Sequence, residues 1–121
     1  MEEKEYYIGI DYGTSNSCIG IYMNSTVVIA PNTIGERTTP SLVAFTDKEI
    51  FAGEEILYQK IEENNLIYEV KRFIGLDYDE FIERDFSKSL NYDVINQDGK
   101  PKIKVILSIF MIKTIIFLLN W

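Results

Sequence analysis

Short apolar runs separated by small polar residues dominate the first thirty positions of the chain. Residues 6–11 and 18–23 are rich in β-branched and aromatic side chains, and the turn between them is small and polar. This pattern predicts a β-hairpin. Asn24 and Ser25 then turn the chain into a third apolar run, residues 26–30. We therefore expect a three-stranded antiparallel meander, which is stable only when at least one face is packed against something else.

The pattern from residue 35 onward mixes short strands with short helices. Leu57 and Ile61 are four positions apart, as on one face of a helix, and Asp98-Gly99 is a pair that hairpin turns favour. The predicted strands are 42–45, 49–52, 92–95 and 100–105, and the predicted helices are 54–63, 67–73 and 79–86. The chain therefore belongs to the mixed α/β class.

The net charge and the cysteine content limit which binding partners and which cell compartment are expected. The net charge is −7, from 12 Lys and Arg against 19 Asp and Glu, and no basic stripe is present. This balance argues against nucleic acid as a partner. Cys18 is the single cysteine, so no internal disulfide can form and a reducing compartment is favoured. Residues 1–5 are acidic and lack the basic and apolar regions of a signal peptide, which predicts a cytoplasmic location.

One turn carries candidate chemistry. Gly13, Thr14, Ser15 and Asn16 follow an apolar strand that ends near Asp11. Such a turn lets the backbone approach an anion, and it offers N–H donors and two hydroxyls. A carboxylate at Asp11 would stand beside that anion, where a divalent cation can bridge the two. Small residues also form ordinary turns, and neither the P-loop nor the dinucleotide-binding glycine pattern is present. The loop alone is therefore compatible with a phosphate-binding site and with an ordinary turn.

Three further segments follow this turn in an order that is typical of one family. They are GERTTPSLVAF at 35–45, VKRFIG at 70–75 and DGKPKIKV at 98–105. Together with IGIDYGTSNSC at 8–18, they resemble the seventy-kilodalton heat-shock chaperones, DnaK-like members of the actin and sugar-kinase ATPase superfamily. The first motif is shared across the superfamily, whereas the segments at 35–45 and 70–75 are specific to these chaperones.

The resemblance implies a fold and a set of ligands. The fold would be the first lobe of an actin-like, ribonuclease H-like ATPase, here incomplete, with an antiparallel meander and short helices. A partial ATPase domain would cover 1–105, with the phosphate hairpin and its sheet at 6–30 and an outer subdomain at 35–105. The ligands would be ATP or ADP with Mg²⁺, and the family activity is ATP hydrolysis coupled to protein folding in the stress response.

The resemblance also implies roles for individual residues. Gly13 to Asn16 would contact the β- and γ-phosphates, and Asp11 would hold the magnesium ion through its water shell. Lys71 would be the catalytic residue, because a fixed cation beside the γ-phosphate and the attacking water stabilises developing charge. Ser15 stands where threonine is commoner and keeps the hydroxyl, and Tyr12 stands where leucine is more usual, which should alter packing and leave the chemistry unchanged.

The resemblance ends at Val105, and residues 106–121 are almost wholly apolar. We expect an N-terminal fragment that lacks the second phosphate loop, the second lobe and the peptide-binding domain. Such a fragment would keep half of a nucleotide site, with no useful turnover and no binding of client peptides. The favoured interpretation of the apolar tail is a truncated gene product whose last residues come from a shifted frame or an unspliced segment.

Two other interpretations of the tail, and one of the whole chain, stay open. As a membrane anchor, the 17 residues from Val105 to Trp121 would reach about 25 Å as a helix, short of a hydrocarbon core of roughly 30 Å. Lys113 near the middle would add a cost of about 3 kcal/mol, so membrane attachment through 106–121 is not favoured. The tail would otherwise cover the open sheet. The last alternative is a soluble dimer that completes the sheet in trans.

Overall fold

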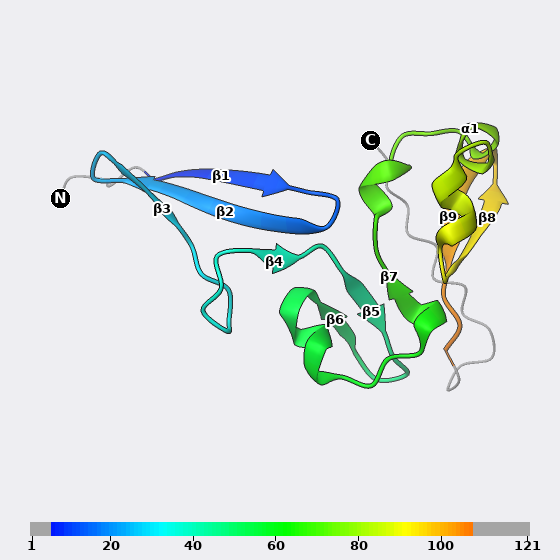
Figure 1. Cartoon of the computed structure of the whole chain (residues 1–121), viewed down its shortest axis with the longest axis horizontal. Helices are drawn as coiled ribbons and strands as arrows, with labels where there is room; N and C mark the ends of the chain where they lie inside the picture. The colour runs from blue at the N-terminus through cyan, green and yellow to red at the C-terminus, as the bar shows by residue number, and fades with distance from the viewer. Residues whose placement is uncertain (1–5, 108–121) are drawn as a thin grey trace.

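The structure is a computed structural model that describes residues 6–107, and it consists of a long ribbon of strands joined to a unit of shorter strands and turns (Figure 1). Most of the apolar tail, 108–121, lies outside the described residues, as do residues 1–5. The predictions about an anchor, a covering segment and Lys113 therefore concern residues that the structure does not describe.

The predicted meander is confirmed. Strand β1 (Tyr7–Tyr12) pairs antiparallel with β2 (Asn16–Met23), which pairs antiparallel with β3 (Thr26–Ile29). The turn between β2 and β3 places Asn24 and Ser25 at φ values of 48° and 62°. Two consecutive positive φ angles are the geometry of a type I′ hairpin turn, whose twist matches that of the flanking strands.

The remaining strands form two small sheets and one extension of the meander. Sheet order is β6-β5-β7 in the second sheet, and β8 and β9 form a separate hairpin. The strands are β4 (Thr39–Pro40), β5 (Val43–Phe45), β6 (Ile50–Ala52), β7 (Leu66–Ile67), β8 (Asp93–Gln97) and β9 (Lys100–Lys104). The sequence pattern missed β4, which pairs with the start of β2 and so ties the meander to the rest of the chain.

The predicted helices are shorter than expected, and most are 3₁₀ turns. The short helices are η1 (Gly53–Tyr58), η2 (Glu63–Asn65), η3 (Val70–Arg72), α1 (Tyr78–Ile82) and η4 (Asp85–Ser89). The helix predicted at 54–63 ends at Tyr58, and Ile56 is its buried apolar side chain, whereas Leu57 is 64% exposed. A single buried anchor suits one tight 3₁₀ turn better than a long amphipathic helix.

The prediction of a helix at 67–73 is wrong for residues 67–69. Ile67 pairs with Val43 in the second sheet and is buried, so strand pairing prevails over the local helical pattern. Glu69 then adopts a left-handed backbone, with φ 57°, and the helical part is limited to the three residues of η3. The helix predicted at 79–86 is split into α1 and η4, where α1 begins with a capping box between Asp77 and Glu80.

The buried core lies in the unit formed by residues 43–105. Aromatic side chains contact one another in this unit: the Phe81 ring centre lies 5.2 Å from that of Phe73, and the Tyr68 ring centre lies 5.4 Å from that of Tyr92. The buried cluster comprises Phe45, Ile67, Phe73, Phe81, Tyr92, Ile103 and Val105. Offset and edge-to-face rings of this kind contribute beyond the area that they bury.

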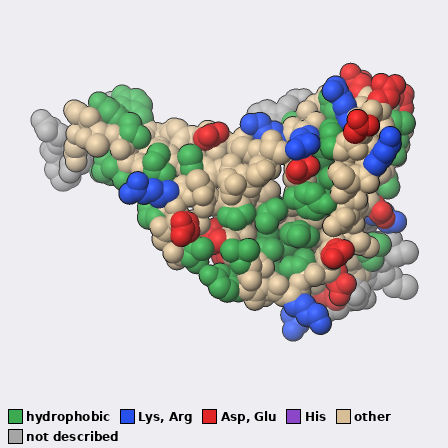
Figure 2. All heavy atoms as spheres, viewed as in Figure 1, with side chains coloured by type: hydrophobic (Ala, Val, Ile, Leu, Met, Phe, Trp, Pro, Cys, Tyr) green, Lys and Arg blue, Asp and Glu red, His purple; other side chains and the backbone are tan. Residues whose placement is uncertain are grey.

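The meander, in contrast, leaves apolar side chains exposed on both of its faces. The strand register places Tyr7, Tyr22 and Val27 on one face, all of them between 44% and 63% exposed. Ile8 and Ile10 lie on the other face and are 66% and 69% exposed. Figure 2 shows apolar side chains on the surface of the meander as well as over the middle of the molecule.

Candidate functional site

The loop between β1 and β2 is packed too tightly for any residue but glycine at its first position. A Cβ atom built on Gly13 would lie 2.1 Å from the backbone oxygen of Asn16, although Cβ atoms essentially never approach closer than 3.0 Å. The loop therefore closes on itself directly behind the end of β1. This close approach is a physical reason for the glycine that the sequence alone did not supply.

Ser41, which directly follows β4, holds the other side of this loop through three hydrogen bonds. Its hydroxyl donates to the carbonyl of Gly13 at 2.8 Å, and its backbone N–H donates to the carbonyl of Ser15 at 2.8 Å. The hydroxyls of Ser41 and Ser17 are also 2.8 Å apart. Ser41 lies in the sequence segment 35–45, and no pattern in that segment indicates this role.

Lys71 reaches the same place from η3. Its Nζ donates to the carbonyl of Tyr12 at 2.6 Å and lies 5.9 Å from the centre of the Tyr12 ring. The two residues are 59 positions apart in the chain. Within residues 6–107, no ion pair joins Lys71 to a carboxylate. Lys71 is exposed, and its charge is available to attract an anion at the neighbouring loop.

Asp11 lies in β1, two positions before the loop, where it pairs with Cys18 and is exposed. Among residues 6–107, no group of three or more potential metal ligands is found. A single exposed carboxylate suits a magnesium ion that keeps most of its water shell, because Mg²⁺ is commonly bound through one or two carboxylates and phosphate oxygens. The structure thus brings Lys71 to the loop that Asp11 precedes, while the roles of these residues stay predictions.

A buried carboxylate supports the chain between β3 and β4. Glu54 is 6% exposed and accepts hydrogen bonds from the backbone N–H and the hydroxyl of Thr33, at 3.0 and 2.7 Å. The Thr33 hydroxyl, together with the backbone donors, lowers the pKa of Glu54. The neighbouring Gly53 packs against Thr39, where an added Cβ would meet a methyl carbon at 2.5 Å. No pattern in the sequence indicated these hydrogen bonds between Thr33 and Glu54.

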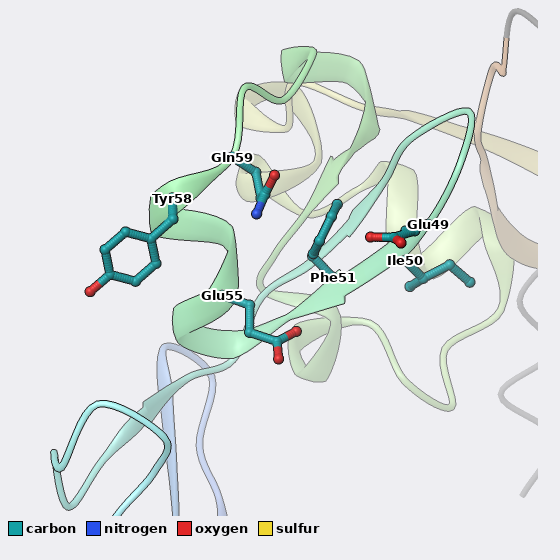
Figure 3. Close-up of a pocket in the computed structure, with 6 residues that line it drawn as sticks. All are labelled: Glu49, Ile50, Phe51, Glu55, Tyr58 and Gln59. Atoms are coloured by element: carbon teal, nitrogen blue, oxygen red, sulfur yellow. The ribbon is translucent and has the colours of Figure 1, made fainter.

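One pocket of the structure lies elsewhere and has different chemistry. Its volume is about 680 Å³, and β6 and η1 supply its walls (Figure 3). The lining residues are Glu49, Ile50, Phe51, Glu55, Tyr58 and Gln59. Two carboxylates in the lining would repel the phosphates of a nucleotide. This pocket therefore gives no support to nucleotide binding, and the loop at residues 13–16 remains the candidate site.

The fold and the loop define a class of protein. The meander with its small-residue turn, and the outer unit of short strands that brings Lys71 to that turn, are consistent with the incomplete actin-like ATPase lobe that the sequence resemblance implies. A family model described as "Hsp70 protein" matches residues 7–111. Its match runs into the segment 106–121 that the sequence analysis treats as unrelated, so the domain boundary at Val105 stays a prediction.

Curated relatives agree with the family model. The chain is 37% identical over 103 residues to heat shock 70 kDa protein 7 of Homo sapiens, covering 84% of this chain and 28% of that protein. It is 38% identical over 98 residues to heat shock 70 kDa protein cognate 1 of Drosophila simulans, covering 80% of this chain and 46% of that protein. The chain belongs to the Hsp70 family, and it spans less than half the length of these relatives.

Family membership confirms the resemblance drawn from the four sequence segments. It places the chain within a family of heat-shock proteins. Among residues 6–107, no helix is both long and apolar enough to cross a membrane.

Proposed function

We propose that the chain binds the phosphate end of Mg-ATP or Mg-ADP at the loop formed by Gly13 to Asn16. The observation that carries this proposal is the position of Lys71, whose Nζ lies 2.6 Å from the carbonyl that directly precedes the loop. A cation without a carboxylate partner, beside a tight glycine turn with hydroxyls, is an arrangement suited to phosphate.

Each residue of the site has a separate task in this proposal. The backbone N–H groups of the loop and the hydroxyls of Thr14 and Ser15 donate to phosphate oxygens. Asp11 would hold Mg²⁺ through its water shell, and the ion would supply positive charge beside the phosphates. Within a complete ATPase site, Lys71 would stabilise the charge that develops during phosphoryl transfer.

We further propose that the 121-residue chain by itself does not hydrolyse ATP at a useful rate and does not bind client peptides. The described residues supply one side of a nucleotide site, and a reacting phosphate also needs groups that exclude water and hold the far side. Loss of a single stabilising donor costs an enzyme about a hundredfold or more in rate.

The compartment is proposed from the cysteine content. Cys18 is the single cysteine and lies in strand β2, which supports a reducing compartment such as the cytoplasm.

Titration with Mg-ADP, followed by ³¹P and ¹H–¹⁵N NMR, tests binding. We expect shifts confined to the loop and its neighbours, and a several-fold weaker affinity in Lys71→Ala. Lys88→Ala is the matched control, because it removes the same charge from the exposed helix η4. Unchanged spectra on addition of Mg-ADP would refute nucleotide binding. Phosphate release from ATP that depends on magnesium and is lost in Lys71→Ala would refute the proposal of inactivity.

A second candidate is a homodimer that completes the meander in trans. The apolar side chains exposed on both faces of β1, β2 and β3 favour it, because such surfaces mark interaction sites. Light scattering over a range of concentrations tests it. A mass of 14.1 kDa at every concentration would exclude the dimer.

A further inference from the structure

Ser41 contacts the candidate phosphate loop through both of its hydrogen-bond donors, and the pattern of these bonds is informative. Its hydroxyl proton goes to the Gly13 carbonyl and its backbone N–H goes to the Ser15 carbonyl. A serine hydroxyl has one proton. The contact of 2.8 Å with Ser17 must then use the Ser17 proton, with the Ser41 oxygen as acceptor.

These bonds fix the direction of two peptide units in the loop. In a planar trans peptide, the N–H points opposite to the C=O of the same unit, and no cis peptide is present among the described residues. The Gly13 carbonyl is directed at Ser41, so the Thr14 N–H is directed away from it. The Ser15 carbonyl is also directed at Ser41, so the Asn16 N–H is directed away from it as well.

We propose that Ser41 is a positioning residue that turns the N–H groups of Thr14 and Asn16 toward the bound phosphate. It does so by holding the Gly13 and Ser15 carbonyls on the opposite side of the loop. A carbonyl oxygen on the phosphate side would repel the anion, and each N–H there attracts it. This inference rests on the proposed function, because it concerns the same site.

The steric fit of the loop adds to this role. Gly13 has no Cβ, and its backbone lies close to that of Asn16, so no side chain of Gly13 helps to fix the peptide plane that it shares with Thr14. Ser41 directly follows β4, which pairs with β2 at Asn16 and Ser17. The outer unit of the protein therefore determines the orientation of the phosphate donors through one residue, whose hydroxyl holds the Gly13 carbonyl and whose backbone N–H holds the Ser15 carbonyl.

The test compares three variants of the ¹⁵N-labelled full chain. Ser41→Ala removes the hydroxyl, Ser41→Thr keeps it, and Ser17→Ala removes only the partner that donates to it. We expect Ser41→Ala to weaken Mg-ADP binding by about three- to tenfold, the effect of one hydrogen bond. Ser41→Thr and Ser17→Ala should stay within about twofold of the parent chain. Unchanged signals from the Phe81 and Tyr92 rings show that the core is intact.

A second measurement separates this inference from the proposed function. Residual dipolar couplings of the Thr14 and Asn16 N–H bonds, recorded without nucleotide, report their orientation in each variant. We expect the Thr14 coupling to change in Ser41→Ala, because the hydroxyl bond to the Gly13 carbonyl is lost. The Asn16 coupling, which depends on the backbone N–H of Ser41, should be retained in Ser41→Ala, and both couplings should be retained in Ser41→Thr. If the parent chain binds no Mg-ADP, the proposed function fails, and with it the phosphate role of Ser41. If the parent binds, but Ser41→Ala matches it in affinity and couplings, the inference alone is overturned.

Discussion

Replacement of Gly13 by alanine is the sharpest perturbation of the candidate site, because its steric cost can be worked out from the structure. The new Cβ would lie 2.1 Å from the Asn16 oxygen and 3.3 Å from the Asn16 carbonyl carbon. The closest approach of real Cβ atoms is 3.0 Å, so the two groups must separate by at least 0.9 Å. Both are backbone atoms or attached directly to the backbone, so no side-chain rotation can relieve the overlap.

The strain should appear as lost affinity for phosphate. Holding a residue in an unfavourable backbone conformation costs about 1–3 kcal/mol, which corresponds to a roughly five- to 150-fold change in an equilibrium constant. We expect Gly13→Ala to weaken Mg-ADP binding by an amount in that range, because the overlap is relieved only when the backbones of Gly13 and Asn16, at the two ends of the loop, move apart. Isothermal titration calorimetry or NMR titration measures the change.

Gly9→Ala is the matched control. Gly9 lies in the middle of β1, and no heavy atom lies within 4 Å of an added Cβ there. Alanine in a strand interior is favoured over glycine by roughly 0.5–1 kcal/mol, so this variant should fold as well as the parent and bind Mg-ADP equally. If Gly13→Ala bound nucleotide as tightly as Gly9→Ala, the argument from close packing would be refuted.

Three further predictions concern the stability of the fold. Phe81→Ala should lower the free energy of unfolding by about 3–5 kcal/mol in urea denaturation, because the ring is buried against Phe73; a loss below about 1 kcal/mol would contradict the assigned core. The pKa of Glu54 is lowered from its ordinary value of 4.5. The ionised carboxylate therefore stabilises the fold above pH 4.5, and this contribution is lost as the pH falls through the folded-state pKa. In Glu54→Gln, the free energy of unfolding should depend less on pH in the acid range. Burial raises the pKa of the Tyr92 hydroxyl, which donates to the Tyr68 carbonyl at 2.5 Å; stability should be complete below pH 10 and fall at higher pH, and Tyr92→Phe, followed by thermal unfolding against pH, should remove that dependence.

Local patterns were sufficient wherever neighbouring residues carry the structural information. The meander and its Asn24-Ser25 turn form as predicted, because strand alternation and hairpin turns depend on short stretches of chain. The same holds for the β8–β9 hairpin, whose turn places Asp98 and Gly99 at φ values of 55° and 78°. Local patterns failed for the helices, where Ile67 pairs with a distant strand and Glu69 adopts a left-handed backbone.

By itself the sequence determined the strands of the meander, the phosphate-type loop and, through four ordered segments, the family. Only the tertiary structure decided how that loop is held. Ser41 bonds to Gly13 across 28 positions, and Lys71 bonds to Tyr12 across 59. Contacts of this separation leave no periodicity in the sequence, because each depends on where a different part of the chain packs. The family motifs named these residues, and the folded chain showed which carbonyls they hold.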